Sequence, residues 1–154
     1  MLTPPPQYAE WMGLALDEAR AALGTGDVPV GAVVLSGGGE VLGLGRNARE
    51  ARQDPTAHAE VEALRAAAAA TGDWQLTDAV LVVTLEPCAM CAGAILSARV
   101  PTVVFGAWDE KAGAAGSVYD LLRDRRLPQR AEVYAGVRAE ECSALLTGFF
   151  DARR

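Results

Sequence analysis

Hydrophobic and polar positions along the chain switch between helical and strand periods. Over residues 8–23, apolar and small residues recur at three- and four-residue steps and stop before a glycine, which predicts a helix. Residues 28–35 and 40–44 are apolar runs on either side of the glycine-rich turn 36–39, a pattern typical of a β-hairpin. A second helix is expected over residues 57–70, because this range ends in an alanine run of high helix propensity.

The second half of the chain continues the alternation of strands and helices. Residues 80–85 form a short apolar run that predicts a buried strand, and a helix is expected over residues 88–97. The remaining elements are expected, in chain order, as a strand over 102–107, a short helix over 118–122, a strand over 132–137 and a closing helix over 139–153. Strands that alternate with helices indicate an α/β protein built as a three-layer sandwich.

The length and composition suit one globular domain. The chain has 154 residues, 51% of them hydrophobic and 22% charged. We expect residues 1–6 to be a flexible N-terminal lead and residues 7–154 to form one domain. The longest uncharged runs are shorter than a membrane-spanning helix requires, so no membrane segment is predicted. Three cysteines, an odd number, indicate a reducing compartment and therefore a cytoplasmic protein.

The charge excludes one class of partner. Fourteen basic residues face 20 acidic ones, which gives a formal net charge of −6. A chain of this charge does not bind duplex DNA or an anionic membrane through bulk electrostatic attraction. A local basic patch remains compatible with the composition.

Two short motifs carry candidate chemistry: His58-Ala59-Glu60 and, further along the chain, Pro87-Cys88-Ala89-Met90-Cys91. The two cysteines are three residues apart at a helix start, so both sulfurs lie on one face near the positive end of the helix dipole, which favours thiolates. Taken alone, the pair fits a redox dithiol, half of a structural zinc site or two buried cysteines.

His58, the only histidine, favours a metal site over a redox dithiol. One imidazole and two thiolates make three protein ligands for zinc and leave the fourth position for water, which is the pattern of a catalytic site. Glu60 would then move protons for the metal-bound water. Cys142 lies in the closing helix without metal-type spacing, so we interpret it as buried and inert.

The chain resembles the bacterial tRNA-specific adenosine deaminases, within the cytidine and deoxycytidylate deaminase superfamily, over nearly its whole length. The zinc motif alone fits many nucleobase deaminases. The segments that carry the narrower resemblance are DVPVGAVV (27–34), GRN (45–47), DPTAHAE (54–60), TLEPCAMCAGAI (84–95), VVFGAWDEKAGAAGS (103–117) and ECSALLTGFF (141–150).

The resemblance implies a fold, a reaction and partners. The fold would be the cytidine-deaminase-like three-layer α/β/α sandwich around a five-stranded mixed sheet. The protein would be a homodimer with one Zn²⁺ per subunit, held by His58, Cys88 and Cys91, and with Glu60 as the proton shuttle. It would convert adenosine to inosine at the wobble position of a tRNA anticodon stem-loop, with no DNA partner.

The resemblance also implies substrate contacts. Asn47 would hydrogen-bond the flipped nucleotide, and the backbone amides of Ala59 and Cys88 would line the site of the attacking hydroxide. Asp109 would lie near the neighbouring nucleotides. The base itself would pack against three consecutive residues: Val28, Pro29 and Val30.

RNA binding by an acidic chain requires a local concentration of positive charge. The candidate cations are Lys111, Arg123, Arg125, Arg126, Arg153 and Arg154, and Trp108 is a candidate stacking residue. Two alternatives remain open. One is a deaminase of a free nucleobase or nucleoside of the guanine or cytosine type, against which the 105–117 segment argues. The other is a non-catalytic zinc-binding subunit, against which the intact Glu60 argues.

Overall fold

A computed structural model describes residues 3–154, so the first two residues of the expected N-terminal lead (residues 1–6) lie outside the described residues. Six-, seven- and three-residue strands form the sheet: β1 (Gly31–Ser36), β2 (Val41–Arg46), β3 (Ala79–Leu85), β4 (Thr102–Ala107) and β5 (Glu132–Tyr134). The helices are α1 (Gln7–Ala22), α2 (Arg49–Arg52), α3 (Ala59–Thr71), α4 (Ala89–Ser97) and α5 (Ala139–Asp151), with a 3-10 turn at Leu23–Thr25 after α1.

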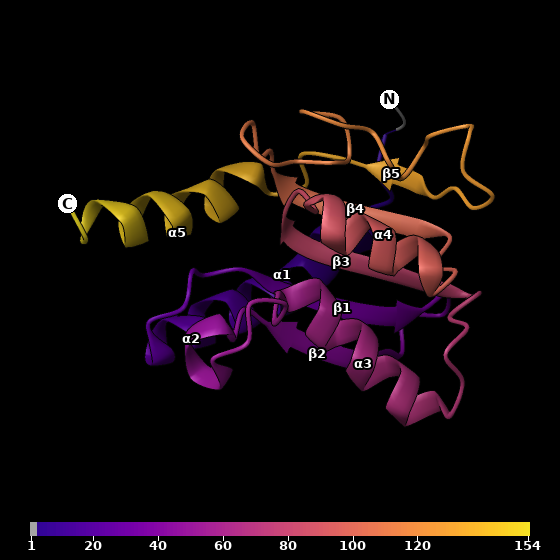
Figure 1. Cartoon of the computed structure of the whole chain (residues 1–154), viewed down its shortest axis with the longest axis horizontal. Helices are drawn as coiled ribbons and strands as arrows, with labels where there is room; N and C mark the ends of the chain where they lie inside the picture. The colour runs from indigo at the N-terminus through magenta and orange to yellow at the C-terminus, as the bar shows by residue number, and fades with distance from the viewer. Residues whose placement is uncertain (1–2) are drawn as a thin grey trace.

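The five strands form one mixed sheet in the order β2-β1-β3-β4-β5. β1 is antiparallel to both β2 and β3, whereas β3, β4 and β5 run parallel to one another. In the centre of the sheet, Val33 pairs with Val82, and Val82 pairs with Val104. The five-stranded mixed sheet is therefore confirmed, and helices cover both of its faces (Figure 1).

Strand side chains alternate between two hydrophobic cores. On β3, Leu81 and Val83 belong to the core beneath α3 and α4, while Val80 and Val82 belong to the core that includes α1 and Cys142 of α5. This alternation follows from the two-residue period of a strand. It explains why the central strands are apolar throughout: both of their faces are buried. The expected three-layer α/β/α sandwich is confirmed.

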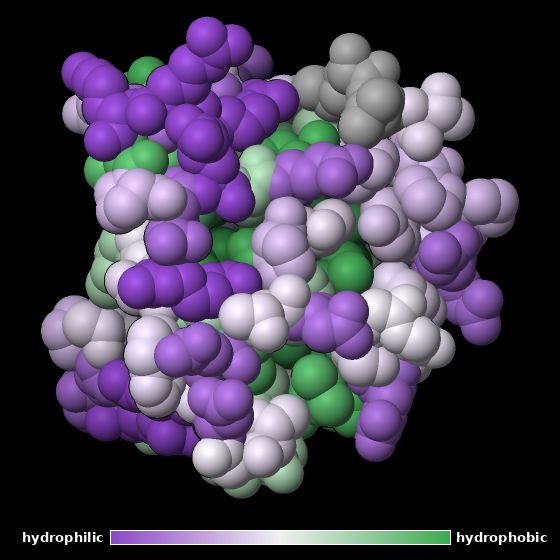
Figure 2. All heavy atoms as spheres, turned by 90° about the vertical axis from the view of Figure 1, so that its right-hand side faces the viewer, coloured by the Kyte–Doolittle hydropathy of each residue, from purple (hydrophilic) through white to green (hydrophobic). Residues whose placement is uncertain are grey.

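The carboxyl ends of β3 and β4 lie at one end of the molecule, together with α2, the first turns of α3 and α4, and the protruding α5 (Figure 1). The opposite end faces the viewer in Figure 2, where hydrophilic side chains cover most of the surface and hydrophobic atoms show in the recesses between them. Ligands of open α/β sheets bind at the carboxyl ends of the strands. Within residues 3–154, no helix is long and apolar enough to cross a membrane.

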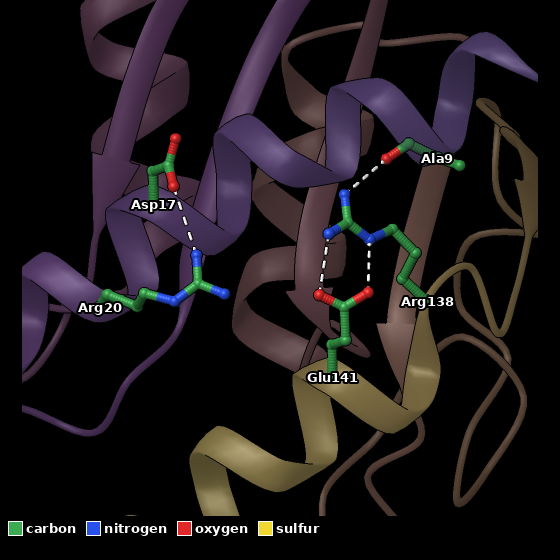
Figure 3. Close-up of polar contacts among 5 residues, drawn as sticks. All are labelled: Ala9, Asp17, Arg20, Arg138 and Glu141. Carbon is green, nitrogen blue, oxygen red and sulfur yellow. Dashed lines mark hydrogen bonds and ion pairs between the residues drawn. The ribbon is translucent and has the colours of Figure 1, made fainter.

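Arg138 fixes the start of α5 to the body of the protein (Figure 3). Its guanidinium donates two hydrogen bonds to the Glu141 carboxylate, at 2.9 and 2.8 Å, and a third to the Ala9 carbonyl of α1, at 3.0 Å. Arg138 itself has a left-handed backbone (φ 53°), which costs free energy for a residue with a side chain. The contacts to α1 and to the next turn of α5 offset that cost and set the direction in which α5 leaves the sheet.

The expected helix over residues 118–122 is wrong. Gly116 has a φ of 135°, and its N–H donates to the Tyr119 carbonyl at 2.8 Å, so the chain reverses there. The Leu121 N–H donates to the Ala114 carbonyl, also at 2.8 Å, instead of to a carbonyl four residues earlier. Turns therefore replace the helix.

Two strand boundaries differ by three residues from the expected ones, and one short helix was not expected. The strand expected from residue 28 begins at Gly31, because the Val30 N–H donates to the Val28 carbonyl in a tight turn at 2.8 Å. The strand expected to residue 137 ends at Tyr134, before the left-handed Gly136. The sequence pattern also did not indicate the short helix α2.

Two glycines let β2 lie directly on the backbone of α3. A Cβ atom on Gly45 would come within 2.3 Å of the Ala59 carbonyl oxygen and 2.4 Å of the Ala63 nitrogen. A Cβ atom on Gly43 would come within 2.5 Å of the Ala67 nitrogen. Because the obstacles are backbone atoms, neither side chain could be accommodated by a rotamer change.

We predict that Gly45→Ala lowers the free energy of unfolding by about 1–3 kcal/mol, because overpacking forces β2 and α3 apart. Gly148→Ala is the matched control: this helical glycine has nothing within 4 Å of the added Cβ, and the change should be neutral or slightly stabilising. Urea unfolding of both variants measures the difference. Equal unfolding midpoints would contradict the close β2–α3 contact.

Candidate active site

Two of the three candidate ligands directly precede a helix. His58 is the N-cap residue of α3 and Cys88 that of α4, and both have extended backbones, with φ and ψ of −78° and 152° and of −77° and 176°. Neither residue uses its side chain as a helix cap, so both side chains are free to turn elsewhere. Cys91 lies in the first turn of α4. The N-termini of two neighbouring helices therefore present all three side chains to one point.

The spacing of these side chains suits a tetrahedral metal ion. The Nδ1 atom of His58 lies 3.6 Å from Sγ of Cys88 and 3.5 Å from Sγ of Cys91. Within the described residues, His58, Cys88 and Cys91 form the group of potential ligands, with their donor atoms all within 4.8 Å of one another. A tetrahedral zinc with bonds of about 2.0–2.1 Å to nitrogen and about 2.3 Å to sulfur separates nitrogen from sulfur by about 3.6 Å. The donor set therefore fits such an ion.

The two cysteines carry unequal charge. A hydrogen bond from the Cys91 thiol, reinforced by one from His58, lowers the pKa of Cys88 to about 3. The same bond to Cys88, together with burial, raises the pKa of Cys91 well above its usual range. The protein alone thus stabilises one thiolate here. A bound cation would supply the charge that stabilises the second.

Glu60 adds a buried carboxyl group beside this triad. It lies in the first turn of α3 and is only 4% exposed. Burial raises the pKa of Glu60 to about 7, with a further contribution from the charge of Cys88. A carboxyl group with a pKa near neutrality can both accept and release a proton, which is the requirement for general acid–base catalysis.

The triad and Glu60 line one cavity of about 250 Å³. Of the six expected substrate contacts, Val28, Val30, Asn47 and Asp109 are in its lining, whereas Pro29 and Ala59 are not. The full lining consists of Val28, Val30, Asn47, Arg49, His58, Glu60, Leu85, Glu86, Cys88, Asp109, Ala112 and Phe150. Residues from six separate segments thus meet at the carboxyl end of the sheet.

Asn47 connects the cavity wall to the metal-binding helix. Its Oδ1 atom accepts a hydrogen bond from the Ala59 N–H at 2.9 Å, and its own N–H donates to the Val30 carbonyl at 3.1 Å. The Ala59 amide, which the resemblance assigned to the hydroxide site, donates to Asn47 in this structure. With one lone pair of Oδ1 engaged by the helix, the NH₂ group supplies the hydrogen-bond donors that the Asn47 side chain can offer a ligand.

Two buried carboxylates were missed by the sequence reasoning. Asp27 is 2% exposed and accepts hydrogen bonds from Thr25 Oγ1 (2.6 Å) and from the N–H groups of Glu50 (2.7 Å) and Ala51 (3.2 Å). Burial opposes its charge, but these hydrogen bonds outweigh burial and lower the pKa of Asp27. Asp27 thereby caps α2, which brings Arg49 to the cavity. The second carboxylate, Glu86, lies in the cavity wall itself.

None of the cations chosen from the sequence is in the cavity lining. Three of them pair with carboxylates of their own segments: Arg123 with Asp120 at 2.9 Å, Arg126 with Asp124 at 2.7 Å and Arg154 with Asp151 at 3.5 Å. The cation in the lining is Arg49, which lay outside that set. Trp108 is 43% exposed and packs edge-on against Phe105. Cys142 is buried against Gly106, apart from the triad, as expected.

The fold and the site together define a class. A His/Cys/Cys triad and a non-ligating glutamate at two helix N-termini are the features of metal-dependent nucleobase deaminases. The MafB19-like deaminase family profile matches residues 7–154.

Individual relatives narrow this class. The chain is 46% identical over 140 residues to a tRNA-specific adenosine deaminase of Bacillus subtilis, covering 91% of this chain and 86% of the relative. It is 46% identical over 143 residues to a tRNA-specific adenosine deaminase of Haemophilus influenzae, covering 93% of this chain and 83% of the relative. The chain belongs to the family of the tRNA-specific adenosine deaminases.

Solved structures agree with this assignment. A tRNA:A34 deaminase, studied for A-to-I editing at the wobble position of transfer RNA, superposes with a TM-score of 0.85 at 39% identity, covering 89% of this chain and 99% of that one. A guanine deaminase of Bacillus subtilis superposes with a TM-score of 0.63 at 38% identity, covering 70% of this chain and 69% of that one.

We predict that Cys91→Ser abolishes stoichiometric metal binding, because serine replaces a soft thiolate ligand by a weakly acidic hydroxyl. Cys142→Ser is the matched control, since Cys142 is equally buried but lies outside the triad. It should retain the metal content of the unmodified protein. Elemental analysis of the purified variants measures this content, and loss of metal from Cys142→Ser would mean that the site has been wrongly delimited.

Proposed function

We propose that this protein is a zinc-dependent hydrolase that converts adenosine to inosine at the wobble position of a tRNA anticodon, with release of ammonia. The observation that supports this proposal best is the convergence of His58, Cys88, Cys91 and Glu60 on a fold that superposes on a tRNA:A34 deaminase. The redox alternative is weaker, because a dithiol needs neither the imidazole nor a buried carboxyl beside it. A non-catalytic subunit would not need Glu60.

The zinc ion would be held by Nδ1 of His58 and the thiolates of Cys88 and Cys91. When bound, it would lower the pKa of a water molecule towards neutrality. Glu60 would accept one proton from the attacking water as the water oxygen bonds to C6 of the base, and would transfer it to N1 of the ring. Glu60 would then take the remaining proton from the oxygen on C6 and deliver it to the amino group, so that the C6–N bond breaks, ammonia leaves and the oxygen stays on C6 as a carbonyl.

The cavity walls would bind the flipped base. The Asn47 NH₂ group donates to the nucleotide, and Val28, Pro29 and Val30 supply an apolar surface beside the ring. The backbone amide of Cys88 borders the reacting oxygen, whereas the Ala59 amide donates to Asn47 and orients its side chain. Asp109, at the rim, lies near the neighbouring nucleotides of an anticodon stem-loop. Of these residues, Val28, Val30, Asn47, Cys88 and Asp109 line the cavity, which supports their part in the proposal.

The active protein would be a homodimer with one zinc ion per subunit. An apolar groove of about 330 Å³ on the outer side of α3 and α4 supports this proposal. Its lining includes Leu64, Ala94 and Trp74, and Trp74 is 58% exposed under the guanidinium of Arg99. Apolar surface of this kind favours association between copies of a chain. The mass in solution, measured by sedimentation, distinguishes a dimer from a monomer.

Inosine formation on a short anticodon stem-loop with adenosine at the wobble position tests the reaction. Free adenosine, guanine and cytosine are assayed in parallel, because the 38% identical guanine deaminase makes a free base the second candidate substrate. Inosine on the stem-loop alone supports the proposal. Ammonia from a free base, with the stem-loop unchanged, would contradict it and make the protein a free-base deaminase.

We predict that Glu60→Gln retains zinc but lowers turnover by about 10²–10⁴-fold, the usual contribution of general acid–base catalysis. Glu62→Gln is the control: it changes a glutamate on the same helix that pairs with Arg52 and lies outside the cavity lining. Its turnover should change less than about threefold. Zinc content and initial rates are measured on the same preparations, and substantial turnover by Glu60→Gln would exclude its role as proton shuttle.

A further inference from the structure

Glu86 is a second buried carboxylate in the cavity wall, and the proposed reaction does not use it. It follows β3, is two residues before Cys88 and is 2% exposed. Its backbone N–H donates to the Ala107 carbonyl of β4 at 2.8 Å, which fixes the main chain at this point. A buried charge is unfavourable unless hydrogen bonds compensate it.

The compensation comes from one distant segment, residues 109–117. Oε1 of Glu86 accepts hydrogen bonds from the Asp109 N–H at 3.0 Å and from the Ser117 hydroxyl. Oε2 accepts from the N–H groups of Ala115 and Ser117, each at 3.0 Å. A carboxylate offers about four lone-pair sites and no donor. All four sites of Glu86 are therefore taken up by this segment, and none is left for a substrate.

The segment also lies against the backbone that leads into α4. The Ala114 N–H donates to the Pro87 carbonyl at 2.7 Å, and Gly113 forms an antiparallel bridge with Cys88. A Cβ atom on Gly113 would lie within 2.3–2.4 Å of the carboxyl carbon and both oxygens of Glu86. Glycine at this position lets the carboxylate reach under the segment. Two residues of the same segment, Asp109 and Ala112, line the cavity.

We propose that Glu86 is a positioning residue: its carboxylate holds residues 109–117 against the start of α4 and thereby sets the places of Asp109 and Ala112 in the wall of the substrate cavity. The proposal rests on the proposed function for its substrate, an adenosine-containing anticodon stem-loop. Glu86 acts through the segment and takes no part in moving protons.

Glutamine is the informative replacement, because it keeps the size of the side chain. Its NH₂ group would face N–H donors of the segment, and donors cannot satisfy one another. We expect Glu86→Gln to keep the metal content, to raise KM for the stem-loop about tenfold or more, and to change kcat less than about threefold. Hydrogen exchange at the amides of Asp109, Ala115 and Ser117 should accelerate about tenfold or more.

Two further variants keep the test decisive if Glu86→Gln folds poorly. Ser117→Ala removes only the hydroxyl donor and should shift KM and segment exchange in the same direction by a smaller factor. Asp27→Asn removes another carboxylate that is 2% exposed and accepts backbone N–H bonds from a distant segment. It should leave exchange within residues 109–117 unchanged.

The outcomes separate the two proposals. Faster exchange confined to residues 109–117, with KM raised and kcat kept, supports positioning by Glu86. Unchanged segment exchange and KM, faster exchange throughout the chain, or a fall in kcat equal to that of Glu60→Gln would each overturn it. If the unmodified protein leaves the stem-loop adenosine intact, the proposed function fails, while the exchange measurement still determines whether Glu86 holds the segment.

Discussion

The close approach of two helix N-termini is the constraint on which the site depends. α3 and α4 begin beside each other at the carboxyl end of β3. The residues that precede them, His58 and Cys88, therefore point toward each other, with Nδ1 of His58 3.6 Å from Sγ of Cys88. Each helix start is held by a different partner. Asn47 accepts the Ala59 N–H at the start of α3, and Gly113 pairs with Cys88 at the start of α4. Because the α4 N-terminus also carries partial positive charge, the same geometry that gathers the ligands favours a thiolate at Cys88.

The charges around the cavity are set by local contacts, so the net charge of −6 does not predict the charge of the cavity. Near the candidate metal ligands, burial raises the pKa of Glu60 to about 7, whereas hydrogen bonds lower the pKa of Cys88 and so favour its thiolate. On the surface, Arg123 and Arg126 pair with aspartates of their own turns, and exposed pairs of this kind add little to stability. Such pairs reduce the free positive charge on that face. Arg49, which the Asp27 cap of α2 carries to the cavity rim, is the cation nearest the chemistry.

Hydrophobic periodicity was sufficient to predict the strands, the long helices and the three-layer fold, because these elements bury regular faces. The convergence of His58, Cys88 and Cys91 was predictable too, since ligand type and helix-start position are local properties. Asp27, Glu86 and the turns of residues 118–122 were not. The turns depend on the positive φ of Gly116 and on local backbone bonds that lack the helical spacing. Asp27 and Glu86 depend on hydrogen bonds between segments far apart in the chain: 23 residues separate Asp27 from Glu50, and 31 separate Glu86 from Ser117. Short-range patterns carry no signal for such pairs, although a charged residue directly after a buried strand, as at Glu86, is a feature that merits attention.

The division between metal centre and cavity wall has a consequence for specificity. This chain superposes both on a tRNA:A34 deaminase and on a guanine deaminase, so the fold by itself does not select the base. In the proposed reaction, His58, Cys88, Cys91 and Glu60 would serve the carbon that loses its amino group and would leave the rest of the nucleotide to other residues. Discrimination must therefore come from the remaining wall, which is assembled from the 28–30 turn, Asn47, the 109–117 segment and Phe150 of α5. These parts are held by long-range contacts of Asp27 with Glu50, of Glu86 with the 109–117 segment and of Arg138 with Ala9, all outside the metal motif. A deaminase built in this way can change its substrate by altering the supports of its loops while the catalytic residues stay the same.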